Sequence, residues 1–214
     1  MAARAVGRAV VAWAAGPKLA EPRSIYRPPW RIDVAVRPGV PRILARAELV
    51  RVVARALEAS KAPRPASLGL ILADDRELAG LNATHMGVEG PTDVLSFPLL
   101  PADAFPARAG GGPADGRAAG PSGAVSLTRA PFRLPPGVRV HLGDIVVSVE
   151  RAISQAETGR GGWTGDRHWA PADELRLLVT HGVLHVCGWD HAEPAEEAAM
   201  RHLEADLLGR LGGA

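Results

Sequence analysis

Three of the seven histidines lie within eleven consecutive residues near the C-terminal end of the chain. They are His181, His185 and His191, at offsets 0, +4 and +10, and Gly188 stands at offset +7. Residues four apart on an α-helix project from one side, so the first two imidazoles can approach one ion. A glycine just past a helix end favours the left-handed conformation that turns the chain back, which would return His191 to the same point. The spacing therefore predicts a metal site on a helix and the turn after it.

The ligand type indicates which metal to expect. Three neutral imidazoles suit Zn²⁺ best, and three protein ligands leave a fourth tetrahedral position for a water molecule, as in catalytic zinc sites. We therefore expect one Zn²⁺ per chain. A structural zinc normally has a fourth Cys or His ligand, but Cys187 lies about 240° around the helix from His181 and is expected to be a small buried residue. A structural zinc remains the alternative.

The same offsets occur in the metzincin proteases, whose motif has a glutamate directly after the first histidine as general base. Gly182 stands at that position here. A glycine accepts no proton, so peptide hydrolysis by this route is disfavoured, and the general base is not identified by the sequence. A metallopeptidase is thus the weaker of the two enzyme hypotheses.

Two acids are candidates to orient the histidine ligands by hydrogen bonds. Asp190 precedes the third histidine, and Glu174 lies on the same side of the predicted helix as the first two. Both have ordinary alternatives, because acids are favoured in a first helical turn and Asp190 is also a common turn residue.

Composition fits one globular domain. The chain has 214 residues, of which 47% are hydrophobic, and Cys187 is its single cysteine, which excludes an internal disulfide framework and suits a reducing compartment. No apolar run is long enough to span a membrane. The net charge of +2 is unevenly spread, because residues 1–66 hold 13 Lys and Arg against 4 Asp and Glu, and the remainder holds 12 against 19. A basic N-terminal part is compatible with a nucleic-acid partner.

Hydrophobic periodicity alternates between strand and helix along the chain. Strands are predicted near residues 32–36, 67–72, 93–97 and 138–149, and helices near 43–57, 74–84, 150–157, 171–186 and 194–211. Intermixed elements of this kind predict a single α+β domain, with a small mixed β-sheet covered by helices.

Two segments do not fit that domain, which we place at residues 31–211. Residues 1–30 are rich in Arg and Ala and predict a poorly ordered basic extension; a targeting peptide is the competing interpretation. Within 101–137, Gly, Pro and Ala fill 23 of 37 positions, which predicts a disordered insertion because little apolar surface can be buried.

Three separate segments together resemble the YbeY family of bacterial rRNA maturation factors. They are Leu81-Asn82 with the run from Gly90 to Pro98, then Leu142-Gly143-Asp144-Ile145, then the histidine motif ending in Gly188-Trp189-Asp190-His191.

The resemblance implies a function as well as a fold. It places the zinc ligands on His181, His185 and His191, and it implies a cytoplasmic single-strand-specific endoribonuclease. Such an enzyme would act in late maturation of the 3′ end of 16S rRNA and in ribosome quality control. Its partners would be single-stranded rRNA and the small ribosomal subunit with its assembly factors, with no membrane involved.

The chain departs from the family pattern at one position. Many members carry an arginine shortly before the Pro-Thr motif, where this sequence has Met86. A thioether cannot stabilise charge on a phosphorane, and the nearest arginines in predicted ordered segments, Arg76 and Arg151, resemble ordinary surface charges. The catalytic residues therefore stay unknown, and a non-catalytic ribosome-assembly factor with a structural zinc is the second hypothesis.

Overall fold

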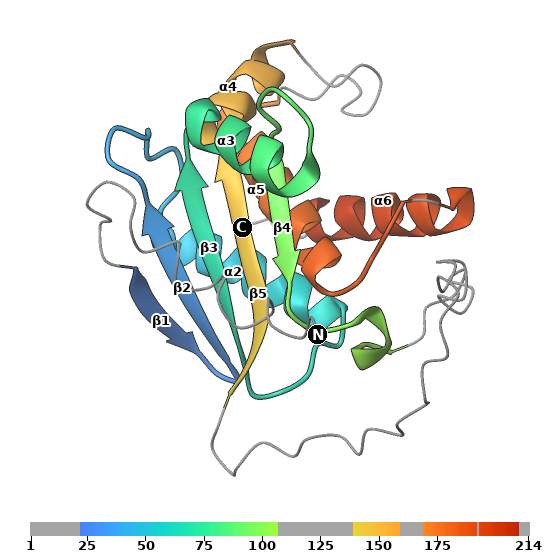
Figure 1. Cartoon of the computed structure of the whole chain (residues 1–214). Helices are drawn as coiled ribbons and strands as arrows, with labels where there is room; N and C mark the ends of the chain where they lie inside the picture. Colours follow the sequence, from blue (N-terminus) through green and yellow to red (C-terminus); the bar gives the residue numbers. More distant parts are fainter. Residues whose placement is uncertain (1–21, 107–138, 159–168, 192, 210–214) are drawn as a thin grey trace, which may run out of the picture.

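A computed structural model describes residues 22–106, 139–158, 169–191 and 193–209 of the chain. Within these residues the chain forms one five-stranded sheet in the order β1-β2-β3-β5-β4, together with five α-helices (Figure 1). The strands are β1 (Arg23–Arg27), β2 (Trp30–Val36), β3 (Ala66–Ala73), β4 (Val94–Pro98) and β5 (Val140–Ser148). The helices are α2 (Arg46–Ala59), α3 (Asp75–Met86), α4 (Val149–Thr158), α5 (Pro171–Val186) and α6 (Pro194–Gly209).

The sheet is mixed, and its parallel part is central. Strands β2, β3 and β5 run parallel, whereas β1 and β4 are antiparallel edge strands. Every residue of β3 is buried, as expected for a parallel strand covered on both faces. The predicted α+β fold with a small mixed sheet and covering helices is therefore confirmed.

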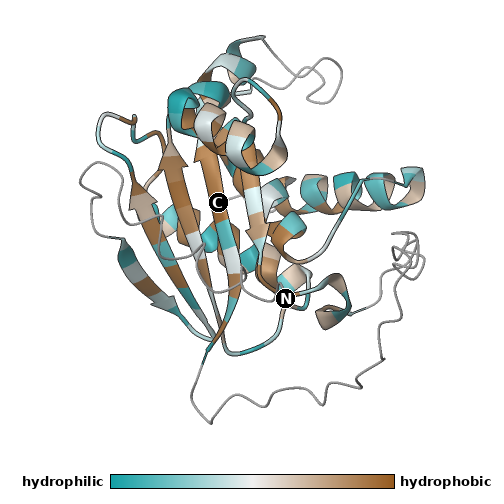
Figure 2. Ribbon diagram, in the orientation of Figure 1, coloured by the Kyte–Doolittle hydropathy of each residue, from teal (hydrophilic) through white to brown (hydrophobic). Residues whose placement is uncertain are grey.

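Helices cover the two faces unequally. Helices α2 and α5 lie behind the sheet in Figure 1 and share its main core, to which Leu68 and Leu70 of β3 and Val183 of α5 belong. Helix α3 covers part of the opposite face, where Leu78 packs with Leu95 in a smaller cluster. The apolar strands run through the middle of the molecule, and the exposed side of α6 is hydrophilic (Figure 2).

Two predictions about disorder need correction. Residues 22–30, assigned to the poorly ordered extension, include β1 and the first residue of β2, and backbone pairing with β2 orders this arginine-rich strand despite its weak apolar pattern. The start of the predicted insertion is also ordered, because residues 102–104 form a short 3₁₀ turn and Phe105 packs into the main core. Residues 1–21 and 107–137 lie outside the described residues.

Helix α5 approaches the sheet closely at Gly182. A Cβ atom at this position would lie 2.7 Å from Cγ2 of Ile145 and 3.1 Å from Cγ2 of Val94. The carbonyl oxygen of Gly182 also accepts a hydrogen bond from Oγ of Ser96, at 3.1 Å. Glycine at the position where a metzincin has its glutamate thus allows α5 to pack directly on β4 and β5.

This contact predicts the effect of adding one methyl group. Alanine in place of glycine inside a helix normally raises stability by about 1 kcal/mol, but overpacking a core costs about 1–3 kcal/mol. We expect Gly182→Ala to lower the free energy of unfolding by about 1 kcal/mol net, measured by urea denaturation.

The matched control is Gly80→Ala in α3, where an added Cβ would meet nothing within 4 Å. We expect this variant to be stabilised by about 0.5–1 kcal/mol. Equal stabilisation by both substitutions would show that α5 does not need the close approach.

Candidate metal centre

The C-terminal end of α5 places the three histidines. His181 and His185 lie one turn apart on the helix, which ends at Val186. Gly188 then adopts a left-handed conformation with φ of 77°. Its N–H bonds the carbonyl of His185, and the N–H of Trp189 bonds that of Leu184, which is the Schellman pattern of a glycine-terminated helix. The predicted chain reversal at Gly188 is therefore present.

The three side chains meet as the spacing predicted. One ring nitrogen from each of His181, His185 and His191 lies within 4.8 Å of the other two. The Nε2 atoms of His181 and His185 are 3.0 Å apart. Two nitrogens bound to one tetrahedral zinc are about 3.3 Å apart, given zinc–nitrogen distances of about 2.0–2.1 Å. The three histidines are thus close enough together to hold one metal ion, and the separation of His181 and His185 is near the value for zinc.

Hydrogen bonds at the opposite ring nitrogens fix which way the histidines face. Nδ1 of His185 lies 2.9 Å from the carbonyl oxygen of Trp189, and Nδ1 of His181 lies 2.7 Å from a carboxylate oxygen of Glu204 on α6. Both acceptors require Nδ1 to donate its proton, so each neutral ring turns the lone pair of Nε2 toward the other. When both rings are neutral, two lone pairs face each other at this 3.0 Å contact, and a cation bound between them would remove their repulsion.

Burial also favours the ligand form of one histidine. The pKa of His185 is lowered from its ordinary value, first by burial and then by the neighbouring His181, while the bond to the Trp189 carbonyl opposes the shift. A lowered pKa keeps the ring neutral, and a neutral imidazole is the form that binds metal. His191 is exposed, so the cluster is open to solvent on its side.

The two acids proposed from the sequence make other contacts. Oδ1 of Asp190 accepts a hydrogen bond from the backbone N–H of His191 at 2.8 Å, which stabilises the turn that carries this histidine. Glu174 is fully buried, and its carboxylate accepts a 2.6 Å hydrogen bond from Nε1 of Trp169. A contribution of either acid to ligand orientation stays a prediction. Cys187 is fully buried, as expected.

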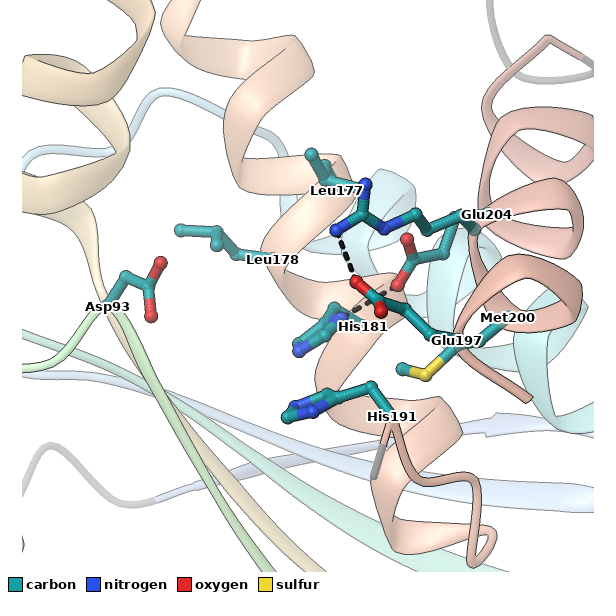
Figure 3. Close-up of a pocket in the computed structure, with 9 residues that line it drawn as sticks. Asp93, Leu177, Leu178, His181, His191, Glu197, Met200 and Glu204 are labelled. Atoms are coloured by element: carbon teal, nitrogen blue, oxygen red, sulfur yellow. Dashed lines mark hydrogen bonds and ion pairs between the residues drawn. The ribbon is translucent and has the colours of Figure 1, made fainter. Parts of the chain in front are cut away.

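A cleft of about 390 Å³ opens beside the histidines. Figure 3 shows His181 and His191 on one side and Asp93 across from them, with the acids of α6 nearby. The lining residues are Asp93, Leu177, Leu178, His181, His191, Glu197, Met200, Arg201 and Glu204. Asp93 comes from the Pro-Thr-Asp motif, and its carboxylate is held by the side chain of Gln155 at 3.0 Å and by the backbone N–H of Val94 at 2.9 Å.

Sequence reasoning missed the contribution of α6. Glu197, Arg201 and Glu204 lie at offsets 0, +4 and +7 of this helix, so they share one side with Met200. The hydrophobic periodicity of α6 predicts only which side of the helix is buried. Polar residues beside the buried side of α6 were the available sequence signal for a site, but only the folded chain shows that they face the histidines.

Other residues singled out in the sequence lie away from the cleft. Met86 ends α3 with 52% of its surface exposed and does not line the cleft. Arg151 is paired with Asp75, at 3.0 Å, and Arg76 is exposed on α3. Neither arginine is among the lining residues.

Asp144, from the Leu-Gly-Asp segment, faces the other side of the sheet. Its neighbour Ile145 points toward α5, so Asp144 points away from it and lies over Gly69, where a Cβ would leave only 2.1 Å to Oδ1. Nε2 of His141 lies 3.3 Å from Asp144, and this hydrogen bond raises the pKa of His141 despite burial. The segment therefore supports the sheet and does not line the cleft.

A family model described as Endoribonuclease YbeY matches residues 40–212. The chain belongs to the YbeY family. The matched range contains all three histidines and the whole cleft, whereas β1 and β2 precede it. Curated relatives agree, each carrying the name Endoribonuclease YbeY. The protein from Roseiflexus castenholzii is 32% identical over 182 residues, which are 85% of this chain and 92% of the relative.

Two further YbeY relatives also match over three quarters or more of both chains. The Thermobifida fusca protein is 36% identical over 83% of this chain and 91% of its own length, and the Salinispora tropica protein is 39% identical over 75% and 85%. A solution structure of a Thermotoga maritima protein aligns with a TM-score of 0.46 at 21% identity, over 85% of this chain and 89% of that one. In the described part of this YbeY chain, no helix is both long and apolar enough to cross a membrane.

The bond between His181 and Glu204 predicts a change in metal affinity. Residues that orient metal ligands contribute about 10- to 100-fold to affinity. We expect Glu204→Gln, which removes the negative charge and keeps the side-chain shape, to weaken zinc binding by about tenfold, measured by competition with a chelator of known affinity.

Glu174→Gln is the matched comparison, because Glu174 is an equally buried acid that contacts Trp169 instead. We expect its zinc affinity to stay within about twofold of the parent protein, since the substitution changes a hydrogen bond to Trp169 and not one to a histidine ring. A larger loss for Glu174→Gln than for Glu204→Gln would contradict the orientation seen here.

Proposed function

We propose that this YbeY protein is a zinc-dependent endoribonuclease that cleaves single-stranded RNA. The step that we propose for it is late maturation of the 3′ end of 16S rRNA, with a further part in ribosome quality control. Membership of a family whose curated relatives are named endoribonucleases supports the reaction class. The observation that carries the metal dependence is the convergence of three histidine nitrogens within 4.8 Å at the wall of a cleft.

The residues of this chain have distinct parts in that function. His181, His185 and His191 would hold one Zn²⁺, and Glu204 keeps the first of these rings in the metal-binding tautomer. A zinc ion bound there supplies Lewis acidity, which lowers the pKa of a water molecule and polarises a phosphate oxygen. Asp93 stands across the cleft from His181 and His191.

A basic surface outside the cleft supports an RNA partner. Arg42, Arg51 and Arg55 are exposed on or just before α2, within residues 37–64, the part of the basic N-terminal region from which we expect attraction to RNA. Arginines of this kind attract phosphates without regard to sequence. Other arginines of the segment serve the fold, such as Arg37, which is paired with Glu77.

Partners and location follow from the same assignment. Acting on 16S rRNA places the protein with the small ribosomal subunit and its assembly factors, in the cytoplasm. The second candidate is an assembly factor in which zinc is structural, and the observation that favours it is Met86, which is exposed and lies outside the cleft.

Zinc removal and one ligand substitution separate the two candidates. We expect the purified chain to bind one zinc and to cut a single-stranded RNA that spans the 3′ end of 16S rRNA, but not the same RNA in a duplex. His185→Ala should abolish stoichiometric zinc binding and reduce cleavage by at least about 100-fold, because metal catalysis contributes several kcal/mol. Circular dichroism checks that the variant is folded.

His202→Ala is the matched control, because His202 is exposed on α6 and does not line the cleft. It should keep both zinc and activity. His191→Ala provides a second ligand variant at an exposed position in case His185→Ala unfolds. A zinc-loaded, folded parent chain that cuts no RNA, together with ligand variants that unfold, would favour the assembly factor.

A further inference from the structure

The charge balance of the cleft is unfavourable for a polyanion. Asp93, Glu197 and Glu204 line the cleft, and Arg201 is the one lysine or arginine among its lining residues. RNA carries a phosphate at every nucleotide, and its binding depends on cations placed along its path. Besides a zinc ion held by the histidines, a strand that reaches them therefore meets one positively charged side chain among the lining residues, that of Arg201.

The position of Arg201 is fixed from within its own helix. Its Nη2 bonds Oε1 of Glu197, one turn earlier on α6, and the arginine side chain is 57% exposed. In the described part of the chain, Glu197 is the acceptor that this guanidinium contacts. A guanidinium has five N–H donors in a planar fork that matches the oxygens of a phosphate, so donors remain for a ligand.

Of the arginines that could be compared with Arg201, Arg176 bonds two acids, whereas Arg151 bonds one acid, as Arg201 does, but away from the cleft. Arg176 bonds both Glu48 and Asp173 with its side chain 20% exposed, and it ties α5 to α2. Arg151 bonds Asp75 and lies outside the cleft. An exposed pair four residues apart on one helix contributes little to stability, so folding alone does not account for Arg201 at this place.

We propose that Arg201 binds a phosphate of the single-stranded RNA in the cleft. This inference rests on the proposed function and adds a residue to it. Glu197 holds the guanidinium toward the cleft in the absence of RNA, and a phosphate competes with it for the same donors. Arg201 is therefore a substrate-binding residue on α6, a helix in which sequence analysis identified no candidate site residue.

Salt-dependent binding tests this role without relying on turnover. The probe is a short fluorescent single-stranded RNA with phosphorothioate linkages that slow cleavage, titrated with the zinc-loaded full chain at several salt concentrations. Loss of one phosphate contact should make the slope of log affinity against log salt shallower by about 0.7. We expect this change for Arg201→Gln, with roughly tenfold weaker binding at low salt, as for the loss of a charged hydrogen bond.

Three further variants complete the experiment. Arg201→Lys keeps the charge and should retain the slope while losing part of the affinity, because a lysine lacks the planar fork. Glu197→Gln should bind RNA more tightly than the parent chain, since it removes a competing acceptor and a repelling charge. Arg76→Gln is the matched control on α3, exposed and outside the cleft, and is expected to lose less affinity than Arg201→Gln.

The outcomes separate this inference from the proposed function. If the parent chain binds and cuts RNA while Arg201→Gln keeps its affinity and salt slope, Arg201 is an ordinary surface arginine and the inference is wrong. Equal losses in Arg76→Gln and Arg201→Gln would also overturn it, because the effect would then reflect overall charge. If the parent chain binds no single-stranded RNA, the proposed function fails, and this inference fails with it.

Discussion

The packing of α5 against β4 and β5 is the contact on which the metal centre depends. Gly182 lets the helix backbone come close enough that a Cβ would lie 2.7 Å from Ile145. With that side of α5 fixed against the sheet, His181 and His185 can lie only on the side that faces the cleft. Gly182, which stands where a metzincin has its catalytic glutamate, is thus required for packing. The contact that buries this side of α5 also orients the histidines on its other side.

Two hydrogen bonds then orient the histidine rings that the packing of α5 brings to the cleft. The carbonyl oxygen of Trp189 and the carboxylate of Glu204 accept hydrogen bonds from Nδ1 of two histidines, which turns the Nε2 atoms of both rings toward a shared point. One of these acceptors comes from the turn after α5 and the other from α6, so the centre requires both the glycine-terminated helix end and the docking of the last helix. Helix α6 also carries Glu197 and Arg201, and it therefore sets the charge of the cleft as well as the tautomer of His181.

The sequence predicted helix α5 and the turn that follows it, because both depend on residues that are neighbours in the chain. Helix α5 was predicted at its observed bounds from Pro171 and its periodicity, and the turn at Gly188 follows from a glycine just past a helix end. Strand β1 was missed because Arg23–Arg27 is ordered by pairing with β2 and has little apolar pattern of its own. Glu204 was missed for a related reason: its partner is 23 positions away, and only tertiary packing brings them together.

The central claim is that three histidine nitrogens bind one zinc ion, and X-ray absorption at the zinc edge of the purified chain tests it most directly. The account predicts nitrogen and oxygen neighbours at about 2.0–2.1 Å, with the outer-shell scattering of three imidazoles and no sulfur at about 2.3 Å. Loss of one imidazole contribution in His191→Ala would identify the third ligand. A sulfur neighbour, which only Cys187 or a methionine could provide, or fewer than three imidazoles in the parent protein, would contradict the account.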